Sequence, residues 1–237
     1  MSEKVCNPAG DLSDAYAEPE SVKGVPVAEG PSAVNDSLRM VLQDAVAGRH
    51  SLLMLGANGT EQIMRDAARE ALRMMPPLTD DEAQEVACAM GAGGIEGEVT
   101  RPFRAPYHSI SIAGLIGGGK PIMPGEITLA NHGVLYLEGL HEFSPAALRH
   151  LSCAMCDKSV TITRNTDTAT MPADFMLIAS AKPCPCGNFG NPDRDCTCSP
   201  NVIMRYQGLL FRSLDFDMVV SVSKNDAVYC LNKTRED

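Results

Sequence analysis

Residues 51–64, which read SLLMLGANGTEQIM, have the layout of a phosphate-binding loop: an apolar strand, a turn containing glycine, and the start of a helix. A working loop reads G-x-x-x-x-G-K-[ST], in which backbone N–H groups and the lysine hold phosphates and the hydroxyl binds Mg²⁺. Gly56 and Gly59 are present, but the last three positions, which should be glycine, lysine and Ser/Thr, carry Glu61, Gln62 and Ile63. The candidate nucleotide-binding residues are Gly56, Ala57, Asn58, Gly59, Thr60, Glu61, Gln62 and Ile63.

These substitutions predict that Mg·ATP binds weakly or not at all. A charge-assisted bond such as that of the missing lysine is worth about 1.5–3 kcal/mol, so its loss weakens binding roughly ten- to a hundredfold. Glu61 adds negative charge beside a polyanion, and Ile63 cannot ligate Mg²⁺. Arg65, one turn into the helix, could replace the lost cation, but we expect it to be a solvated or salt-bridged surface charge.

Four cysteines lie within fifteen residues in the pattern C-x-C-x₉-C-x-C: Cys184, Cys186, Cys196 and Cys198. In a chain without a secretion signal, such a cluster predicts metal ligands rather than disulfides. Four thiolates suit a structural zinc ion, and the short loop 187–195 can bring the two pairs together. Free surface thiols are the alternative, although four of them would be prone to oxidation.

A second cysteine pair, Cys153 and Cys156, lies at the end of an expected helix with the spacing C-x₂-C. A redox pair or another metal site would be compatible with this spacing. We interpret these cysteines instead as helix-packing residues.

The composition predicts a folded cytoplasmic protein rather than a membrane protein. The chain has 237 residues, 44% of them apolar, and a formal net charge of −10, which argues against broad attraction to nucleic acid or an anionic membrane. No apolar run approaches the ~18 residues of a membrane span, and the N-terminus has no signal-peptide core. We expect a disordered acidic tail over 1–33, a core over 34–224 with a zinc loop at 183–199, and a C-terminal tail over 225–237.

The elements expected to position these residues alternate between strands and helices. Two continuous apolar runs, Leu52–Leu55 and Val134–Leu137, are typical of strands buried on both faces. Asn35 or Asp36 is expected to cap the first helix, and Thr79 to begin another with a capping box. Further strands are expected at 160–164, 175–179 and 218–222, helices at 37–47, 64–75, 80–90, 145–155 and 201–210, and hairpins within 98–130. This alternation predicts an α/β fold with a mainly parallel sheet and helices on both faces.

Six segments resemble, in order and in spacing, those of the AAA+ magnesium chelatase subunit I family, and in particular its bacterial ComM branch. They cover roughly residues 34–222, and ComM-like proteins carry a similar four-cysteine insertion. The resemblance implies an AAA+ P-loop NTPase-like core that normally works in a ring, where ATP hydrolysis drives metal insertion into a porphyrin or DNA remodelling. The segments are RPFRAPYH (101–108), GGG (117–119), PGEITL (124–129), GVLYL (133–137), PADFMLI (172–178) and PCPCG (183–187).

The resemblance places four of the family's catalytic positions on residues that differ from the usual ones. Glu138 stands where an aspartate binds Mg²⁺, and Gly139 where a glutamate activates water. Lys182 occupies the position of a sensor asparagine, and Asp215 that of an arginine finger. Glu138 could still bind Mg²⁺ and Lys182 could reach a γ-phosphate. Phosphoryl transfer needs a positioned metal, an oriented water and a charge-stabilising group together, so we expect no competent catalytic residue.

The leading hypothesis is therefore a pseudo-ATPase that acts as an interaction or scaffold module. The family's helical lid and N-terminal Lon-like domain are expected to be missing. An intact AAA+ paralogue or another copy of the chain would be the partner, with DNA suggested by family analogy alone. The alternative is an ATP-hydrolysing motor, for DNA remodelling or metal chelation, which uses non-standard residues or groups from a partner. A decayed gene product without a selected role is a third possibility.

Arg101, Arg104 and His108 lie in a segment that the family inserts into its core as a hairpin. Such basic residues could contact DNA or a neighbouring subunit. We expect a structural hairpin held by local hydrogen bonds instead.

Overall fold

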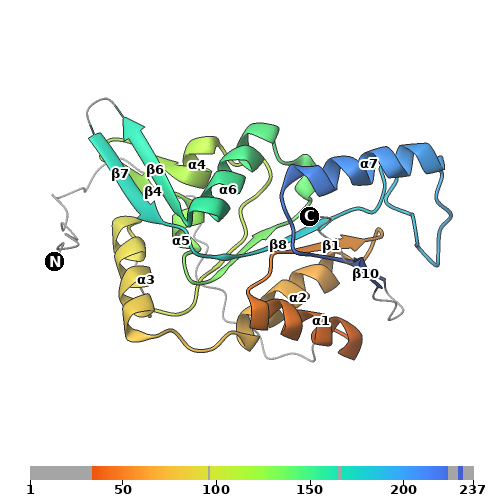
Figure 1. Cartoon of the computed structure of the whole chain (residues 1–237), viewed down its shortest axis with the longest axis horizontal. Coiled ribbons are helices and arrows are strands. Elements are labelled where there is room, and N and C mark those ends of the chain that lie inside the picture. Colours follow the sequence, from red (N-terminus) through yellow and green to blue (C-terminus); the bar gives the residue numbers. More distant parts are fainter. Residues whose placement is uncertain (1–33, 96, 165–166, 224–228, 232–237) are drawn as a thin grey trace, which may run out of the picture.

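A six-stranded sheet forms the centre of the protein in a computed structural model that describes residues 34–95, 97–164, 167–223 and 229–231 (Figure 1). The strand order is β10-β9-β1-β8-β5-β2, in which β10 pairs antiparallel with β9 and the other pairs are parallel. The strands span Leu52–Gly56 (β1), Phe103–Arg104 (β2), Val134–Leu137 (β5), Met176–Ala181 (β8), Met218–Val222 (β9) and Tyr229–Leu231 (β10).

Helices cover both faces of this sheet, as the alternation of elements predicts (Figure 1). Alternate residues of β1 enter different cores: Leu53 packs on the side of α6 (Pro145–Asp157) and α7 (Pro200–Ser213). Leu52 packs on the side of α1 (Asp36–Gly48) and α2 (Glu61–Met74). Both side chains are fully buried. Burying a leucine stabilises the fold by about 1.5–3 kcal/mol, which explains why central strands are continuously apolar.

Two predicted helix starts are confirmed. Asn35 Oδ1 accepts a hydrogen bond of 2.7 Å from Leu38 N at the start of α1. Thr79 and Glu82 form a capping box at the start of α3 (Asp80–Ala92), which runs two residues past its predicted end. Helix α2 begins at Glu61, three residues before its predicted start.

The region 98–130 contains a short hairpin, as predicted, and two helices that were not. The hairpin pairs β3 (Gly117–Gly118) with β4 (Met123–Pro124). The helices are α4 (Ile112–Ile116) and α5 (Glu126–Leu129), and their apolar residues Leu115 and Ile127 are buried. Each helix is too short to show a periodic pattern in a stretch rich in glycine and proline.

Two further elements depart from the sequence-based prediction. The strand expected at 160–164 is β6 (Ser159–Arg164), which pairs with β7 (Asp167–Pro172) in a separate two-stranded sheet instead of joining the central one. Strand β10 lies in the range expected to be a C-terminal tail, so the central sheet extends beyond residue 224. The expected tail at 1–33 lies outside the described residues. Within the described part of the chain, no helix is both long and apolar enough to cross a membrane.

Candidate functional site

The central sheet brings most of the predicted site residues to one edge. In open α/β sheets, ligands bind beyond the carboxyl ends of the parallel strands. Pairing of Leu55 with Ala181 sets Gly56, the last residue of β1, beside Lys182, which follows β8. Glu138 and Gly139 follow β5, the next strand along. The candidate loop, the two positions after β5, and Lys182 therefore share one edge.

The loop between β1 and α2 keeps the tight turn of a phosphate-binding loop. Thr60 donates to the carbonyl of Ala57 through both Oγ1 (2.7 Å) and the backbone N (3.1 Å). A Cβ at Gly56 would lie 2.1 Å from Thr60 Oγ1, and Gly59 has a φ of 91°, which favours glycine. Both glycines are thus required by the turn itself.

The three substituted positions after this turn each have a local structural role. Glu61 Oε2 accepts a hydrogen bond of 2.8 Å from the backbone N–H of Gly59. Gln62 Nε2 donates to Asp66 Oδ1 at 2.8 Å, along the exposed side of α2. Ile63 packs against the core on the α1–α2 side. A loop N–H that could bind an anion is therefore already bonded to a carboxylate of the chain itself.

Two of the three residues that the sequence suggests as substitutes for the usual nucleotide-site groups, Glu138 and Arg65, form an ion pair with each other. Arg65 Nη2 donates to Glu138 Oε2, and this hydrogen bond is the main cause that raises the pKa of Arg65. Gly139, next along the chain, is left-handed with a φ of 68°. A glutamate at this position would be strained, since side chains with a Cβ rarely adopt that conformation.

A carboxylate that the sequence did not single out lies beside Gly139, in the short 3₁₀ helix Leu140–Glu142. Glu142 Oε2 lies 3.1 Å from His108 Nε2, and Glu142 Oε1 lies 3.5 Å from His141 Nε2. A Cβ at Gly139 would lie 3.5 Å from Glu142 Cδ. Glu142 therefore approaches the position of the missing glutamate, but two imidazoles contact its oxygens.

Burial lowers the pKa of His141, as do the nearby charges of Lys182 and His108, while Glu142 acts in the opposite direction. Lys182 forms no ion pair with any carboxylate of the described residues. The ring of Tyr206, from α7, packs edge-on against His141 with 5.9 Å between centroids. The Tyr206 hydroxyl is buried with no hydrogen-bond partner in the described structure, and burial raises its pKa to about 12. This corner of the site thus combines a free cation with neutral aromatic groups.

The four predicted cysteines come together in space, in the loop that follows Lys182. Their sulfur atoms all lie within 4.8 Å of one another. Three of the distances are 3.4 Å for Cys184–Cys186, 3.7 Å for Cys184–Cys196 and 3.6 Å for Cys186–Cys196. A tetrahedral site with Zn–S bonds of about 2.3 Å has sulfurs about 3.8 Å apart, so the cluster fits a four-coordinate metal.

Backbone donors around the cluster also suit thiolate ligands. The N–H of Phe189 points to Cys184 Sγ at 3.3 Å. Backbone N–H groups of Asn188 and Thr197 hold the pKa of the Cys186 thiol far below its usual range, at about 5, whereas such bonds at Cys196 and Cys198 are outweighed by burial and by the neighbouring Cys184 and Cys186, which raise the pKa of Cys196 and of Cys198. Hydrogen bonds to the charged form favour it, and the thiolate is the form that binds metals.

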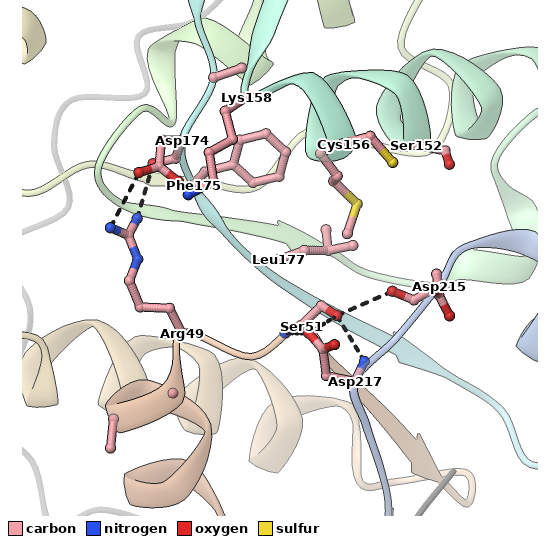
Figure 2. A pocket seen from close by; sticks show the side chains of 14 residues that line it. Arg49, Ser51, Ser152, Cys156, Lys158, Asp174, Phe175, Leu177, Asp215 and Asp217 are labelled. Carbon is pink, nitrogen blue, oxygen red and sulfur yellow. Dashed lines mark hydrogen bonds and ion pairs between the residues drawn. The ribbon is translucent and has the colours of Figure 1, made fainter. Parts of the chain in front are cut away.

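Asp215 lies away from this site, at the opposite edge of the sheet. It lines a pocket of about 560 Å³ with Ser51 and Asp217, which precede β1 and β9 (Figure 2). Ser51 Oγ donates to Asp217 Oδ2 at 2.8 Å and to the Asp215 carbonyl at 3.3 Å. Across the pocket, the Asp174 carboxylate forms ion pairs with Arg49 and Lys158.

The interpretation of Cys153 and Cys156 as packing residues is wrong, because both are exposed on α6. Cys156 lines the pocket beside Asp215 (Figure 2). The spacing alone does not tell which face of the helix is buried.

The basic residues of the inserted segment are held by contacts within the chain, but the expected hairpin with local hydrogen bonds is wrong: β2 pairs parallel with β5, and the bonds reach residues more than 20 positions away. Arg104 forms two hydrogen bonds of 2.6 Å with the carboxylate of Glu126. Arg101 donates to the backbone carbonyls of Pro76 and His132. These contacts tie strand β2 to α5 and to the loop before β5.

Comparison with known proteins gives consistent matches. Residues 33–228 match the family described as magnesium chelatase, subunit ChlI. Competence protein ComM of Haemophilus influenzae is 38% identical over 175 residues, which cover 71% of this chain and 33% of ComM. YifB of Escherichia coli is 33% identical over 201 residues, which cover 83% of this chain and 35% of YifB. Rv2897c of Mycobacterium tuberculosis is 34% identical over 208 residues, which cover 85% of this chain and 40% of Rv2897c. The chain thus spans at most about two fifths of the length of these relatives.

Proposed function

The chain belongs to the magnesium chelatase subunit ChlI family, and on this premise we propose that it is a member that does not hydrolyse ATP and acts as an interaction or scaffold module. Its AAA+ core keeps the shape of a nucleotide site. The groups that would bind and cleave the nucleotide are replaced or engaged elsewhere.

The observation that carries this proposal is the hydrogen bond from Gly59 N to Glu61 Oε2. A phosphate would have to displace this carboxylate and then remain beside it. Two unit charges 4 Å apart interact by about 1 kcal/mol in water and about 4 kcal/mol near a protein surface. That repulsion adds to the loss of the lysine and opposes nucleotide binding.

The ion pair of Arg65 with Glu138 supports the loss of hydrolysis independently. A Mg²⁺ ion at Glu138 would have to break this pair. No carboxylate follows at Gly139 to orient a water, and catalysis of phosphoryl transfer depends almost entirely on such positioning. Breaking the ion pair opposes Mg²⁺ binding, whereas the missing base affects activation of the water. Repairing one of these defects would not repair the other.

We also propose that the cysteine cluster holds a structural zinc ion. Cys184, Cys186, Cys196 and Cys198 would be its four ligands, and a site closed by four thiolates has no open position for a reacting water. The zinc would stabilise the fold of the loop. The scaffold role calls for a partner, which we propose to be an intact AAA+ paralogue or another copy of the chain; binding to DNA rests on family analogy alone.

A rival function, ATP hydrolysis with substitute groups, is favoured by two observations. Lys182 has no ion pair among the described residues and follows the strand beside the loop. Glu142 lies near the position of the missing glutamate. Both histidines would have to release Glu142 before it could serve as a base.

Titration of the protein with Mg·ATP, followed by calorimetry, tests the proposed loss of binding. We expect no saturation at about 1 mM nucleotide, a concentration that corresponds to −4.1 kcal/mol. Glu61→Gln, which keeps the shape but removes the charge, should bind nucleotide about fivefold more tightly because about 1 kcal/mol of repulsion is removed. Saturable micromolar binding by the unaltered protein, lost in Lys182→Met, would favour the rival.

A further inference from the structure

The candidate nucleotide loop and the cysteine cluster are joined through one residue, Asn58. Its backbone N donates to the carbonyl of Gly187 at 2.8 Å. Its side-chain Nδ2 donates to the carbonyl of Cys186 at 3.0 Å and to Asn188 Oδ1 at 3.0 Å. These three bonds cross about 130 positions of the sequence and connect two loops that follow neighbouring strands of the sheet.

The backbone that Asn58 contacts is the turn that presents two of the cysteines. Gly187 N donates to the carbonyl of Cys184 at 3.0 Å, which closes this turn. Gly187 has a φ of 76°, and a Cβ there would lie 2.3 Å from Asn58 Oδ1. The close approach of the two loops therefore requires a glycine at 187. Asn58 bonds to the carbonyls of two successive residues, Cys186 and Gly187.

We infer that Asn58 is a positioning residue for the metal, and that metal binding in turn holds the loop at 56–60 in its closed form. Asn58 fixes the carbonyls of Cys186 and Gly187, and hence the direction in which the Cys184 and Cys186 sulfurs point. Coupling between two sites is reciprocal. If metal binding favours the closed form of the loop by a given factor, closing the loop must raise the metal affinity by the same factor. The inference rests on the proposed metal site and is independent of whether ATP is hydrolysed.

Much of the cysteine loop lies near the surface: Phe189 is 46% exposed, and of the four cysteines only Cys184 is buried. Metal binding and folding are coupled in such sites, so a bound metal should order this loop. When the metal leaves, Asn58 loses the acceptors at Cys186 and Gly187, and the turn that contains Gly59 loses its neighbour.

Zinc affinity, measured by competition with a chromophoric chelator, tests one direction of the coupling. Asn58→Ala should weaken zinc binding about 10- to 100-fold, the usual effect of removing a residue that orients a ligand. Gln62→Ala is the matched control, because Gln62 lies in the same segment but its side chain bonds, within the described part of the chain, to Asp66 alone; the zinc affinity of this variant should stay unchanged. If Asn58→Ala does not fold, Asn58→Asp, which keeps the shape but lacks the Nδ2 donor, should also weaken binding. Unchanged affinity in a folded Asn58 variant would overturn the inference.

Amide hydrogen exchange of the unaltered protein, with zinc and after chelation, tests the other direction. The Asn58 amide, which donates to Gly187, should exchange faster after chelation. The amide of Leu53, in the fully buried strand β1, should keep its rate. Equal acceleration at both amides, or none at Asn58, would overturn the coupling. Protein that takes up no zinc would refute the metal site as well, but would leave the proposed loss of ATP hydrolysis standing.

Discussion

Restoring the consensus residues of the nucleotide loop should restore binding without restoring hydrolysis. The variant Glu61→Gly/Gln62→Lys/Ile63→Thr supplies the missing glycine, lysine and hydroxyl on a turn whose shape is already correct. It also removes the carboxylate that accepts from Gly59 N at 2.8 Å. We expect a gain in Mg·ATP affinity from each of these changes.

The size of this gain follows from the contacts involved. The lysine adds about 1.5–3 kcal/mol of charge-assisted bonding, and removal of the Glu61 charge adds about 1 kcal/mol at 4 Å in water. Together these predict a gain of roughly 70- to 900-fold in affinity, measurable with a fluorescent ATP analogue. The matched control carries Gln62→Leu in place of Gln62→Lys and should lose the part due to the lysine.

Turnover should remain absent in the restored variant, because the Arg65–Glu138 pair and Gly139 are unchanged. Either of two results would contradict the predicted gain of binding without hydrolysis. One is a restored variant that binds no better than its leucine control. The other is ATP turnover in the restored variant, which would mean that groups other than those after β5 can orient the water.

Three further predictions concern stability and metal content. Arg104→Met should lower the free energy of unfolding by about 2–3 kcal/mol, because it leaves the Glu126 carboxylate without its two hydrogen bonds; Arg149→Met, on the exposed side of α6, should change it by less than about 0.5 kcal/mol in urea denaturation. Burial raises the pKa of Tyr136 to about 12, which favours its neutral form in the folded state; this stability is full below pH 10 and is lost as the pH rises towards 12, by up to about 2.7 kcal/mol. Urea denaturation at pH 9 and 11.5 should show a smaller loss in Tyr136→Phe than in the unaltered protein, and an equal loss would contradict the assignment. Protein purified without chelators should contain about one zinc per chain and Cys196→Ser should contain none, since a closed site needs all four thiolates; less than about half an equivalent in the unaltered protein would contradict the zinc site.

Much of the central sheet can be predicted from the sequence because its strands are buried on both faces. The runs that include Leu52 and Val134 have no polar side that would mark a loop or an amphipathic helix. Strand β7, by contrast, reads DTATMP and is largely exposed, so it lacks the apolar pattern of a core strand. It is stabilised by pairing with β6, including a hydrogen bond between Thr161 and Thr170.

The types of residue in the candidate site were readable from the sequence, but their contacts were not. The motif shows that the lysine position is Gln62 and that four cysteines are close in the chain. It does not show that Arg65 pairs with Glu138, because this contact spans 73 positions and depends on how α2 packs beside β5. The same holds for Asn58, whose partners follow a strand more than 100 residues later. Long-range contacts of single polar side chains leave no local periodicity.

Phosphate release from ATP by the purified protein, measured at saturating Mg²⁺ alongside Glu138→Gln and Glu142→Gln variants, decides whether this protein is a pseudo-ATPase. We expect the unaltered protein to release phosphate no faster than either variant, because Glu138 is paired with Arg65 and Glu142 with two histidines. Turnover that is abolished by Glu138→Gln or by Glu142→Gln would contradict this expectation and would establish an active ATPase with substitute residues.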